Sequence, residues 1–152
     1  MEPQPIVSIR GRRPADDVPA FIQGAFKDLF GRLRLLAVVP AGPPFVIYHE
    51  FAVDGIDAEV SVPIDRPISA AGRMVSRILP AMTVAGTVHL GSYEALSAAY
   101  AAVSGWIRDH GSEAAGPMQE RYLNGPGDDV AASAYRTEVE IPVIPSAVVA
   151  AG

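Results

Sequence analysis

The stretch Gly42–Tyr48 reads GPPFVIY, and 74 residues later Gly116–Tyr122 reads GPMQERY. A second match follows at a shift of 79, where EVSVPI at 59–64 corresponds to EVEIPV at 138–143. Two similar halves in one small domain usually bury a shared core and leave a cleft where they meet. The sequence therefore predicts a duplicated fold, with the functional site in the cleft between the two repeats.

Length and composition limit the classes of protein. The chain has 152 residues, 49% hydrophobic and 19% charged, which suits one globular domain spanning residues 1–152. It has no cysteine and a formal net charge of -5, and its basic residues are scattered. These features argue against a disulfide scaffold and against direct nucleic-acid binding. No apolar run is long enough to cross a membrane and the start lacks a signal peptide, so we expect a cytoplasmic protein.

The periodicity of apolar residues gives the order of elements. Repeat one, about 6–64, holds a strand, a helix starting near Val18 and capped by Asp16 or Asp17, and two strands. A linker at 65–81 includes a strand at 74–79, repeat two covers about 82–143 with the same order, and a tail follows at 144–152. We therefore predict an α+β fold: duplicated strand-helix-strand-strand modules with pseudo-two-fold symmetry and an antiparallel sheet carrying both helices on one face.

Glu120 breaks the match between the halves, because its counterpart in the first half is Val46. The two-residue period of a strand places Glu120 on one face with Met118 and Tyr122. A carboxylate between an apolar and an aromatic neighbour is costly to bury unless it is paired, protonated or kept for a ligand. Two structural alternatives stay open: this face lies in solvent, or an arginine such as Arg121 pairs with the carboxylate. The predicted site centres on Glu120.

Aromatic side chains complete the predicted site. Aromatic walls around one buried carboxylate suit planar or cationic organic molecules, through stacking, cation–π contacts and charge neutralisation. The predicted ligand-binding residues are Glu120, Tyr48, Tyr93, Trp106, Tyr122, Phe45 and Met118. The three histidines lie in separate segments without metal-ligand spacing, so we predict no metal site, and no nucleotide motif indicates a cofactor.

Several stretches together carry a family resemblance. They are LPAMTVA at 79–85, VHLGSYEAL at 88–96, GPMQERYL at 116–123, TEVEIPV at 137–143, GPPF at 42–45 and YH at 48–49. In this order and spacing they resemble the GyrI-like small-molecule-binding domain, which also serves as the effector-binding module of some bacterial multidrug-responsive transcription regulators. The resemblance covers about residues 6–143. It implies a ligand cleft between two modules, an acidic pocket residue at Glu120, and aromatic pocket residues at Tyr48, Tyr93, Tyr122 and Trp106.

The resemblance and the residues lead to three hypotheses of function. The first is a stand-alone sensor or scavenger that binds lipophilic, aromatic or cationic xenobiotics and can signal to a protein partner. The second is a hydrolase of strained or ester-bearing xenobiotics, with Glu120 as general base and Tyr93 or Tyr122 orienting the substrate. The third, inhibition of a topoisomerase through protein–protein contact, rests on analogy with one branch of the family. The chain is too short to add a helix-turn-helix domain, so we expect no operator binding.

Overall fold

The structure is a computed structural model that describes residues 3–52, 54–93, 96–124 and 131–144. It divides into two compact units, here called the N-terminal unit (Glu2–Ala81) and the C-terminal unit (Met82–Gly152). The predicted tail beyond Ile144 lies outside the described residues. Each unit has one long α-helix and a set of antiparallel strands, which confirms the predicted α+β class.

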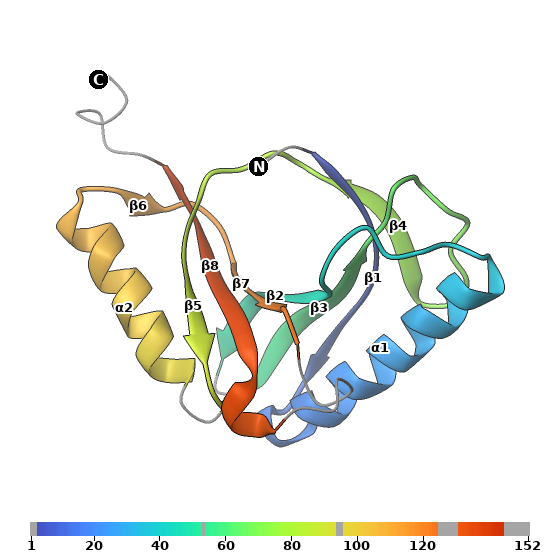
Figure 1. Ribbon diagram of the computed structural model, residues 1–152, viewed down its shortest axis with the longest axis horizontal. Helices are drawn as coiled ribbons and strands as arrows, with labels where there is room; N and C mark the ends of the chain where they lie inside the picture. Colours follow the sequence, from blue (N-terminus) through green and yellow to red (C-terminus); the bar gives the residue numbers. More distant parts are fainter. Residues whose placement is uncertain (1–2, 53, 94–95, 125–130, 145–152) are drawn as a thin grey trace. The chain divides into compact units, whose positions relative to one another are not determined.

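The N-terminal unit contains one helix on a four-stranded sheet. Its elements are β1 (Gln4–Arg13), α1 (Val18–Leu35), β2 (Phe45–Ala52), β3 (Gly55–Pro63) and β4 (Met74–Leu79). The strand order is β4-β1-β3-β2, and each neighbouring pair is antiparallel. The helix packs against β1 and β3 (Figure 1). The order strand, helix, strand, strand is the predicted one, and β4 coincides with the strand predicted in the linker.

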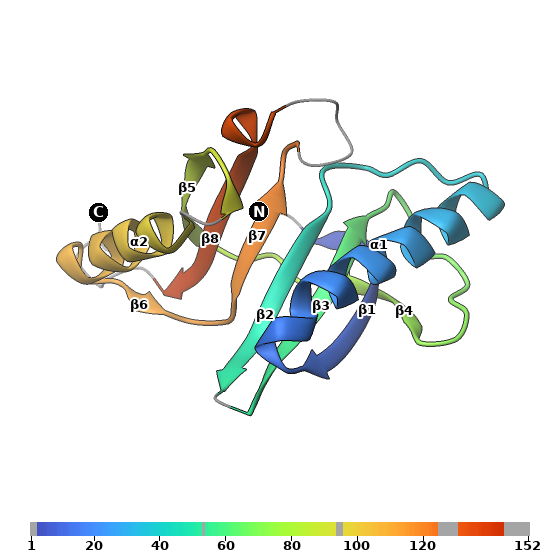
Figure 2. The ribbon, with the colours of Figure 1, turned by 90° about the horizontal axis from the view of Figure 1, so that it is seen from below.

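The C-terminal unit repeats this order. Its elements are β5 (Val84–Leu90), α2 (Leu96–Asp109), the two-residue strand β6 (Glu113–Ala114), β7 (Met118–Tyr122) and β8 (Arg136–Ile144). Here β8 lies between β7 and β5, and β6 also pairs with β8 (Figure 2). The helix α2 packs against β5 and β8. Both units thus carry their helix on one face of the strands.

The strand registers reproduce the repeat seen in the sequence. In the N-terminal unit Val46 of β2 is paired with Val60 of β3. In the C-terminal unit Glu120 of β7 is paired with Val139 of β8. The first members of the two pairs differ by the shift of 74 and the second members by the shift of 79. The duplication therefore extends to the cross-strand partners, and Glu120 occupies the backbone position of Val46.

The helices bury part of the apolar stripes that their spacing predicts, while Ile22, Phe26, Leu36 and Tyr100 of those stripes are only partly buried. The buried residues are Val18, Phe21, Ala25, Leu29 and Leu33 of α1, and Leu96, Ala99, Val103 and Ile107 of α2. The second set packs against Ala85, Val139 and Ile141 of the sheet. Trp106, which the spacing also assigns to the stripe, is 49% exposed. The core stripe of α2 is therefore narrower than the apolar residues alone indicate.

The start of α1 differs from the prediction in its detail. Asp17 stands at the N-cap position, yet its side chain makes no capping hydrogen bond. The preceding residues Ala15–Asp17 form a 3-10 turn, which already places Asp17 at φ -94° and ψ -10°. A capping side chain needs an extended backbone at the N-cap to reach back to the helix amides. The 3-10 turn removes that geometry, so the predicted side-chain cap is wrong.

Candidate functional site

Glu120 lies in the middle of β7 and is buried, with 8% of its surface exposed. The hydroxyl of Tyr100 donates a hydrogen bond to its Oε1 at 2.7 Å. The hydroxyl of Tyr122 donates to its Oε2 at 2.8 Å. Each oxygen of the carboxyl group therefore accepts a hydrogen bond from a tyrosine hydroxyl. These two bonds help to fix the orientation of the group inside the protein.

Helix and strand geometry bring these three side chains together. Tyr122 is two residues from Glu120, and this spacing places both on one face of β7. Tyr100 belongs to α2, which covers that face, and it packs with Met118 at the edge of the buried cluster under the helix. The face of β7 that carries Met118, Glu120 and Tyr122 is therefore the one beneath α2. The alternation expected from the sequence holds in this strand.

Two further tyrosines extend the site. The ring of Tyr93 meets that of Tyr122 edge-on, with centroids 5.8 Å apart. The ring of Tyr93 also stacks on that of Tyr135, at 5.2 Å and an interplanar angle of 30°. Tyr93 is 37% exposed, so this series of rings runs from the buried carboxylate to the surface of the unit. We call these five residues the Glu120 cluster: Glu120, Tyr100, Tyr122, Tyr93 and Tyr135.

Thr137 lies next to this cluster with an unsatisfied hydroxyl. It is the cross-strand partner of Tyr122 on one side and of His89 on the other. Its side chain is fully buried, and in the described part of the chain Oγ1 has no hydrogen-bond partner. Leaving a buried hydroxyl unpaired costs about 1–3 kcal/mol. A buried hydroxyl of this kind can take an ordered water, an ion or a ligand as its partner.

The structure brings some predicted site residues together and places others elsewhere. Trp106 stacks on His110 near the end of α2, at a ring distance of 4.1 Å. Tyr48 belongs to the N-terminal unit and stacks on Phe51 at 5.0 Å. Phe45 is three residues before Tyr48 in β2 and so points to the opposite face of that strand. Ligand contacts of Trp106, Tyr48 and Phe45 stay predictions.

Two members of the Glu120 cluster, Tyr100 and Tyr135, belong to the aromatic residues that the sequence suggests around Glu120 but are not among the predicted ligand-binding residues. Tyr100 lies at helical spacing with apolar residues, a position typical of a core side chain. A signal was nevertheless present, because the first-half counterpart of Tyr100 is Phe26, just as the counterpart of Glu120 is Val46. The second half thus has a hydroxyl and its acceptor at two positions that the fold places in contact, where the first half has two apolar side chains.

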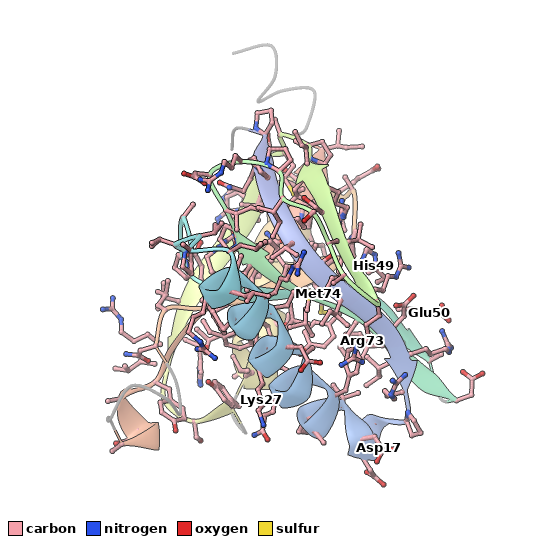
Figure 3. All side chains as sticks on the ribbon, turned by 90° about the vertical axis from the view of Figure 1, so that its right-hand side faces the viewer. Asp17, Lys27, His49, Glu50, Arg73 and Met74 are labelled. Carbon is pink, nitrogen blue, oxygen red and sulfur yellow. The ribbon has the colours of Figure 1, made fainter. Side chains whose placement is uncertain are left out.

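A different buried carboxylate organises the N-terminal unit. Glu59 of β3 is 3% exposed and accepts hydrogen bonds from three other strands. Ser8 of β1 donates at 2.6 Å, His49 of β2 lies at 2.8 Å, and Arg77 of β4 binds both oxygens at 2.7 and 3.0 Å (Figure 3 labels His49). Burial alone would raise the pKa of Glu59, but the bonds from Arg77, Ser8 and His49 outweigh it and lower the pKa to about 2. This group joins all four strands.

The corresponding face of the C-terminal unit holds a carboxyl pair. Glu138 and Glu140 alternate along β8 on the same side, and Arg121 of β7 binds Glu140 at 3.2 Å. Gln119 also donates to Glu140, at 3.3 Å. Burial and the neighbouring charge of Glu140 raise the pKa of the Glu138 carboxyl. Arg121 therefore forms an ion pair with Glu140, on the face of β7 opposite Glu120.

Neither charged centre has the composition of a metal site. Within residues 3–52, 54–93, 96–124 and 131–144, no three His, Asp or Glu side chains converge as ligands would. His49 is hydrogen-bonded to Glu59, and His89 contacts the carbonyl oxygen of Ser92 at 2.9 Å.

None of the helices in the described ranges is long and apolar enough to span a bilayer.

Comparison of the sequence with known protein families finds a match. Residues 1–144 match the family described as the GyrI-like small molecule binding domain. The chain belongs to the GyrI-like family. It therefore carries a small-molecule-binding domain, as the resemblance of its sequence motifs predicts. No curated protein is a significant match to the chain.

Solved structures share the fold at low sequence identity. The C-terminal domain of EcmrR superimposes with a TM-score of 0.83 at 21% identity, covering 95% of this chain and 94% of that one. In the complex of EcmrR with DNA the match covers 55% of the EcmrR chain, so this chain spans about half the length of EcmrR. SAV2435 bound to tetraphenylphosphonium matches with a TM-score of 0.67 at 15% identity, covering 95% and 90% of the two chains. A hydrolase from Listeria innocua matches with a TM-score of 0.68 at 12% identity, covering 94% and 88%.

Proposed function

We propose that this GyrI-like protein binds lipophilic organic cations at the Glu120 cluster and acts as a sensor or scavenger of such compounds. The observation that supports it is a buried carboxylate held through both oxygens by tyrosine hydroxyls, at 2.7 and 2.8 Å, next to further tyrosine rings. The two tyrosine hydroxyls hold the carboxyl group in a fixed orientation beside aromatic rings. An organic cation at this position would gain both electrostatic attraction to the carboxyl group and contact with the rings.

The rings give the proposed ligand its second property. Tyr122, Tyr93 and Tyr135 are in mutual contact, and aromatic faces attract cations as well as apolar surface. A delocalised cation with aryl groups loses little hydration energy on burial, so ring contacts and the carboxylate act together. A small inorganic cation would lose more hydration and gain no ring contacts. The structure of SAV2435 with tetraphenylphosphonium shows that a protein of this fold holds such a compound.

Hydrolysis is the second candidate, supported by the shared fold with a hydrolase from Listeria innocua. In this scheme Glu120 takes a proton from water while the water oxygen bonds to an ester carbonyl carbon. The carbonyl π electrons move to the carbonyl oxygen, which Tyr93 can stabilise. When they re-form the C=O bond, the C–O bond to the leaving alkoxide breaks, and the alkoxide takes the proton that Glu120 had accepted from water. The carboxylate already accepts two hydrogen bonds, so the attacking water would need one of its remaining lone pairs.

The test uses tetraphenylphosphonium as the cationic probe and triphenylphosphine oxide as an uncharged aryl probe, both titrated calorimetrically. We expect Glu120→Gln to weaken binding of the cation at least tenfold and to leave the neutral compound within about twofold. Tyr100→Phe removes one hydroxyl that orients the carboxylate, so a smaller loss of about three- to tenfold is expected. Glu113→Gln, an exposed glutamate on β6, is the matched control and should change neither affinity.

The outcomes separate the two candidates. Equal affinity of wild type and Glu120→Gln for the cation would show that Glu120 does not bind the ligand. For hydrolysis, a chromogenic aryl ester is added and release of the phenol is followed with time. Turnover in the wild type that disappears in Glu120→Gln, with cation binding also lost, assigns both roles to one carboxylate. Turnover that survives in Glu120→Gln excludes Glu120 as the general base.

A further inference from the structure

The strand β5 ends the sheet of the C-terminal unit, with one edge paired to β8 and the other edge open (Figure 1). Two hydrogen bonds just beyond its ends fix which backbone groups face β8. Gly91 donates to the carbonyl oxygen of Tyr135 at 2.8 Å, and Val143 donates to that of Thr83 at 2.9 Å. Both pairs follow the same register as the strand pairing between them.

The orientation of every residue in β5 follows from these two bonds. In an antiparallel ladder, residues that exchange hydrogen bonds with one neighbour alternate with residues whose N–H and C=O point the other way. Ala85, Thr87 and His89 therefore direct their backbone groups at β8. The even-numbered residues direct theirs at the open edge: Val84, Gly86, Val88 and Leu90.

The open edge carries none of the usual protection. Its sequence VAGTVHL has no lysine, arginine, aspartate, glutamate or proline, and its pairing with β8 has no bulge. Val88 is 46% exposed and Leu90 is 68% exposed. Proteins normally protect such an edge with a charge, a proline, a bulge or a covering segment, because it is a template for another strand. No other strand in the described residues pairs with this edge.

The edge strand of the N-terminal unit shows the contrast. In β4, the side-chain hydroxyl of Ser76 accepts a hydrogen bond from the backbone N–H of Ile68 at 3.1 Å, so the preceding loop contacts this strand. Arg73, just before β4, is paired with Asp28 of α1 at 3.1 Å and fixes the same loop to the helix (Figure 3 shows Arg73 beside α1). The edge strand β4 is thus in contact with a loop of its own chain, whereas no strand in the described residues pairs with the outer edge of β5.

We propose that β5 pairs antiparallel with the β5 strand of a second copy of this chain, about a two-fold axis at Thr87. This register places Gly86 opposite the partner's Val88 and Val84 opposite the partner's Leu90. All four outward backbone positions of each strand then find a partner. The exposed valine lies over a glycine and the exposed leucine over a valine, and no charge faces another. The edge is therefore self-complementary in hydrogen bonds, shape and charge.

The size of the contact sets the expected strength. A seven-residue strand pair buries less than the roughly 1,600 Å² of a standard stable interface. We therefore expect a reversible dimer that dissociates on dilution. The interface uses β5 alone and leaves the Glu120 cluster within each copy, so it is independent of ligand binding at that cluster.

The test is sedimentation of the 152-residue chain over a wide concentration range, comparing wild type with Val88→Pro. Proline removes the outward N–H of Val88 and none of the bonds to β8, so the fold is kept while the dimer bond is lost. Ile78→Pro is the matched control, because Ile78 is an exposed residue of the other edge strand, β4. Its cross-strand partner Pro5 accepts a hydrogen bond from Ile64 and so directs its carbonyl away from β4. The N–H of Ile78 therefore points away from β1, towards the outer edge, as that of Val88 does. We expect at least a tenfold higher dissociation constant for Val88→Pro and no change for Ile78→Pro.

Val88→Lys is a second variant, which keeps the backbone N–H of residue 88 and places a charge at the proposed interface. Amide hydrogen exchange provides a second measurement. Raising the protein concentration should slow exchange at Gly86 and Val88, but leave Thr87 and His89 unchanged because β8 already protects them. A wild type that is monomeric at every concentration would overturn the proposal. A dimer that persists in both Val88 variants would also overturn it. Equal protection of the outward amides at all concentrations would do the same, because a segment of the same chain would then cover the edge.

Discussion

Glu59 and Glu138 occupy the same position in the two repeats, yet their carboxyl groups behave in opposite ways. The pKa of Glu59 is lowered to about 2, whereas the pKa of Glu138 is raised. In both cases burial pushes the pKa upward, so the difference lies in the neighbours. The carboxylate of Glu59 is hydrogen-bonded by Arg77, Ser8 and His49, whereas the carboxyl group of Glu138 lies near the negative charge of Glu140.

The origin of that difference is visible in the sheets. Arg77 comes from β4, an edge strand that has no counterpart among the described strands of the C-terminal unit. The repeat equivalent of Ser61 is Glu140, which adds a second acid beside Glu138. The duplication therefore conserves the register of the strands and leaves the polar chemistry of each half free to diverge. The same divergence produced Glu120 with Tyr100 where the first half has Val46 and Phe26.

The most disruptive way to test this comparison is Val46→Glu, which places the carboxylate of the second half into the first. Val46 is fully buried, and Phe26, the counterpart of Tyr100, has no hydroxyl to donate. A buried carboxylate without its full set of donors should lower the free energy of unfolding by about 3–5 kcal/mol. Urea unfolding followed by circular dichroism measures the loss.

The double variant Val46→Glu with Phe26→Tyr is the partner experiment. It should recover about 1 kcal/mol relative to Val46→Glu, because one hydrogen bond to the carboxylate becomes available. A loss below 1 kcal/mol in the single variant would mean that the first half accommodates a carboxylate without the tyrosine pair, and the comparison would fail.

The next largest effect is expected for Glu59→Gln. The amide cannot accept the bonds of Arg77, Ser8 and His49 together, and the guanidinium loses its counter-charge. Because the side chain of Arg77 remains 34% exposed, we expect a loss of about 2–4 kcal/mol, at or below the range for fully buried pairs. Asp57→Asn is the control, since its partner Arg10 is 54% exposed and such surface pairs contribute at most about 1 kcal/mol. Equal losses in the two variants would contradict a central role of Glu59.

The contribution of Glu59 to the free energy of unfolding should depend on pH in the acid range. The folded chain keeps Glu59 ionised down to a pKa of about 2, whereas the unfolded chain takes up the proton near 4.5. Its stabilising contribution is therefore present above pH 4.5 and is lost as the pH falls from 4.5 towards 2. The difference in unfolding free energy between wild type and Glu59→Gln should shrink over that window by up to about 3 kcal/mol. A difference independent of pH would show that the lowered pKa contributes nothing.

The sequence predicted the backbone of this protein better than its polar contacts. Apolar periodicity and the two repeat shifts gave both helices, the main strands and the face on which Glu120 lies. Local patterns carry that information, because one period of 2 or 3.6 residues decides which side chains share a face. The hydroxyl of Tyr100 was missed because the same helical stripe that marks a core residue also presents a polar tip to the strand beneath it.

The contacts of Glu59 could not be predicted for a related reason. They join four strands through residues up to 51 positions from Glu59 in the sequence, and Arg77, which supplies the positive charge, lies outside both repeats. Its strand was predicted, but no local pattern pairs that strand with β1 or aims its arginine at β3. Side-chain networks between strands depend on sheet order, which the repeat leaves undetermined.

The smallest expected effect belongs to Glu138→Gln. A raised pKa favours folding only at low pH; that contribution fades as the pH rises through the folded pKa, above which the ionised group is buried beside Glu140 at a cost. Removing its charge should therefore stabilise the protein at pH 7 by less than about 1 kcal/mol, a small gain because the side chain is only half-buried and screened by solvent. At pH 4 the gain should vanish, since Glu138 is then already protonated. Glu113→Gln, exposed on β6, should change neither value. A loss of stability at pH 7 would mean that Glu138 is held by an attractive contact, as Glu59 is, and that the two halves differ less than their pKa shifts imply.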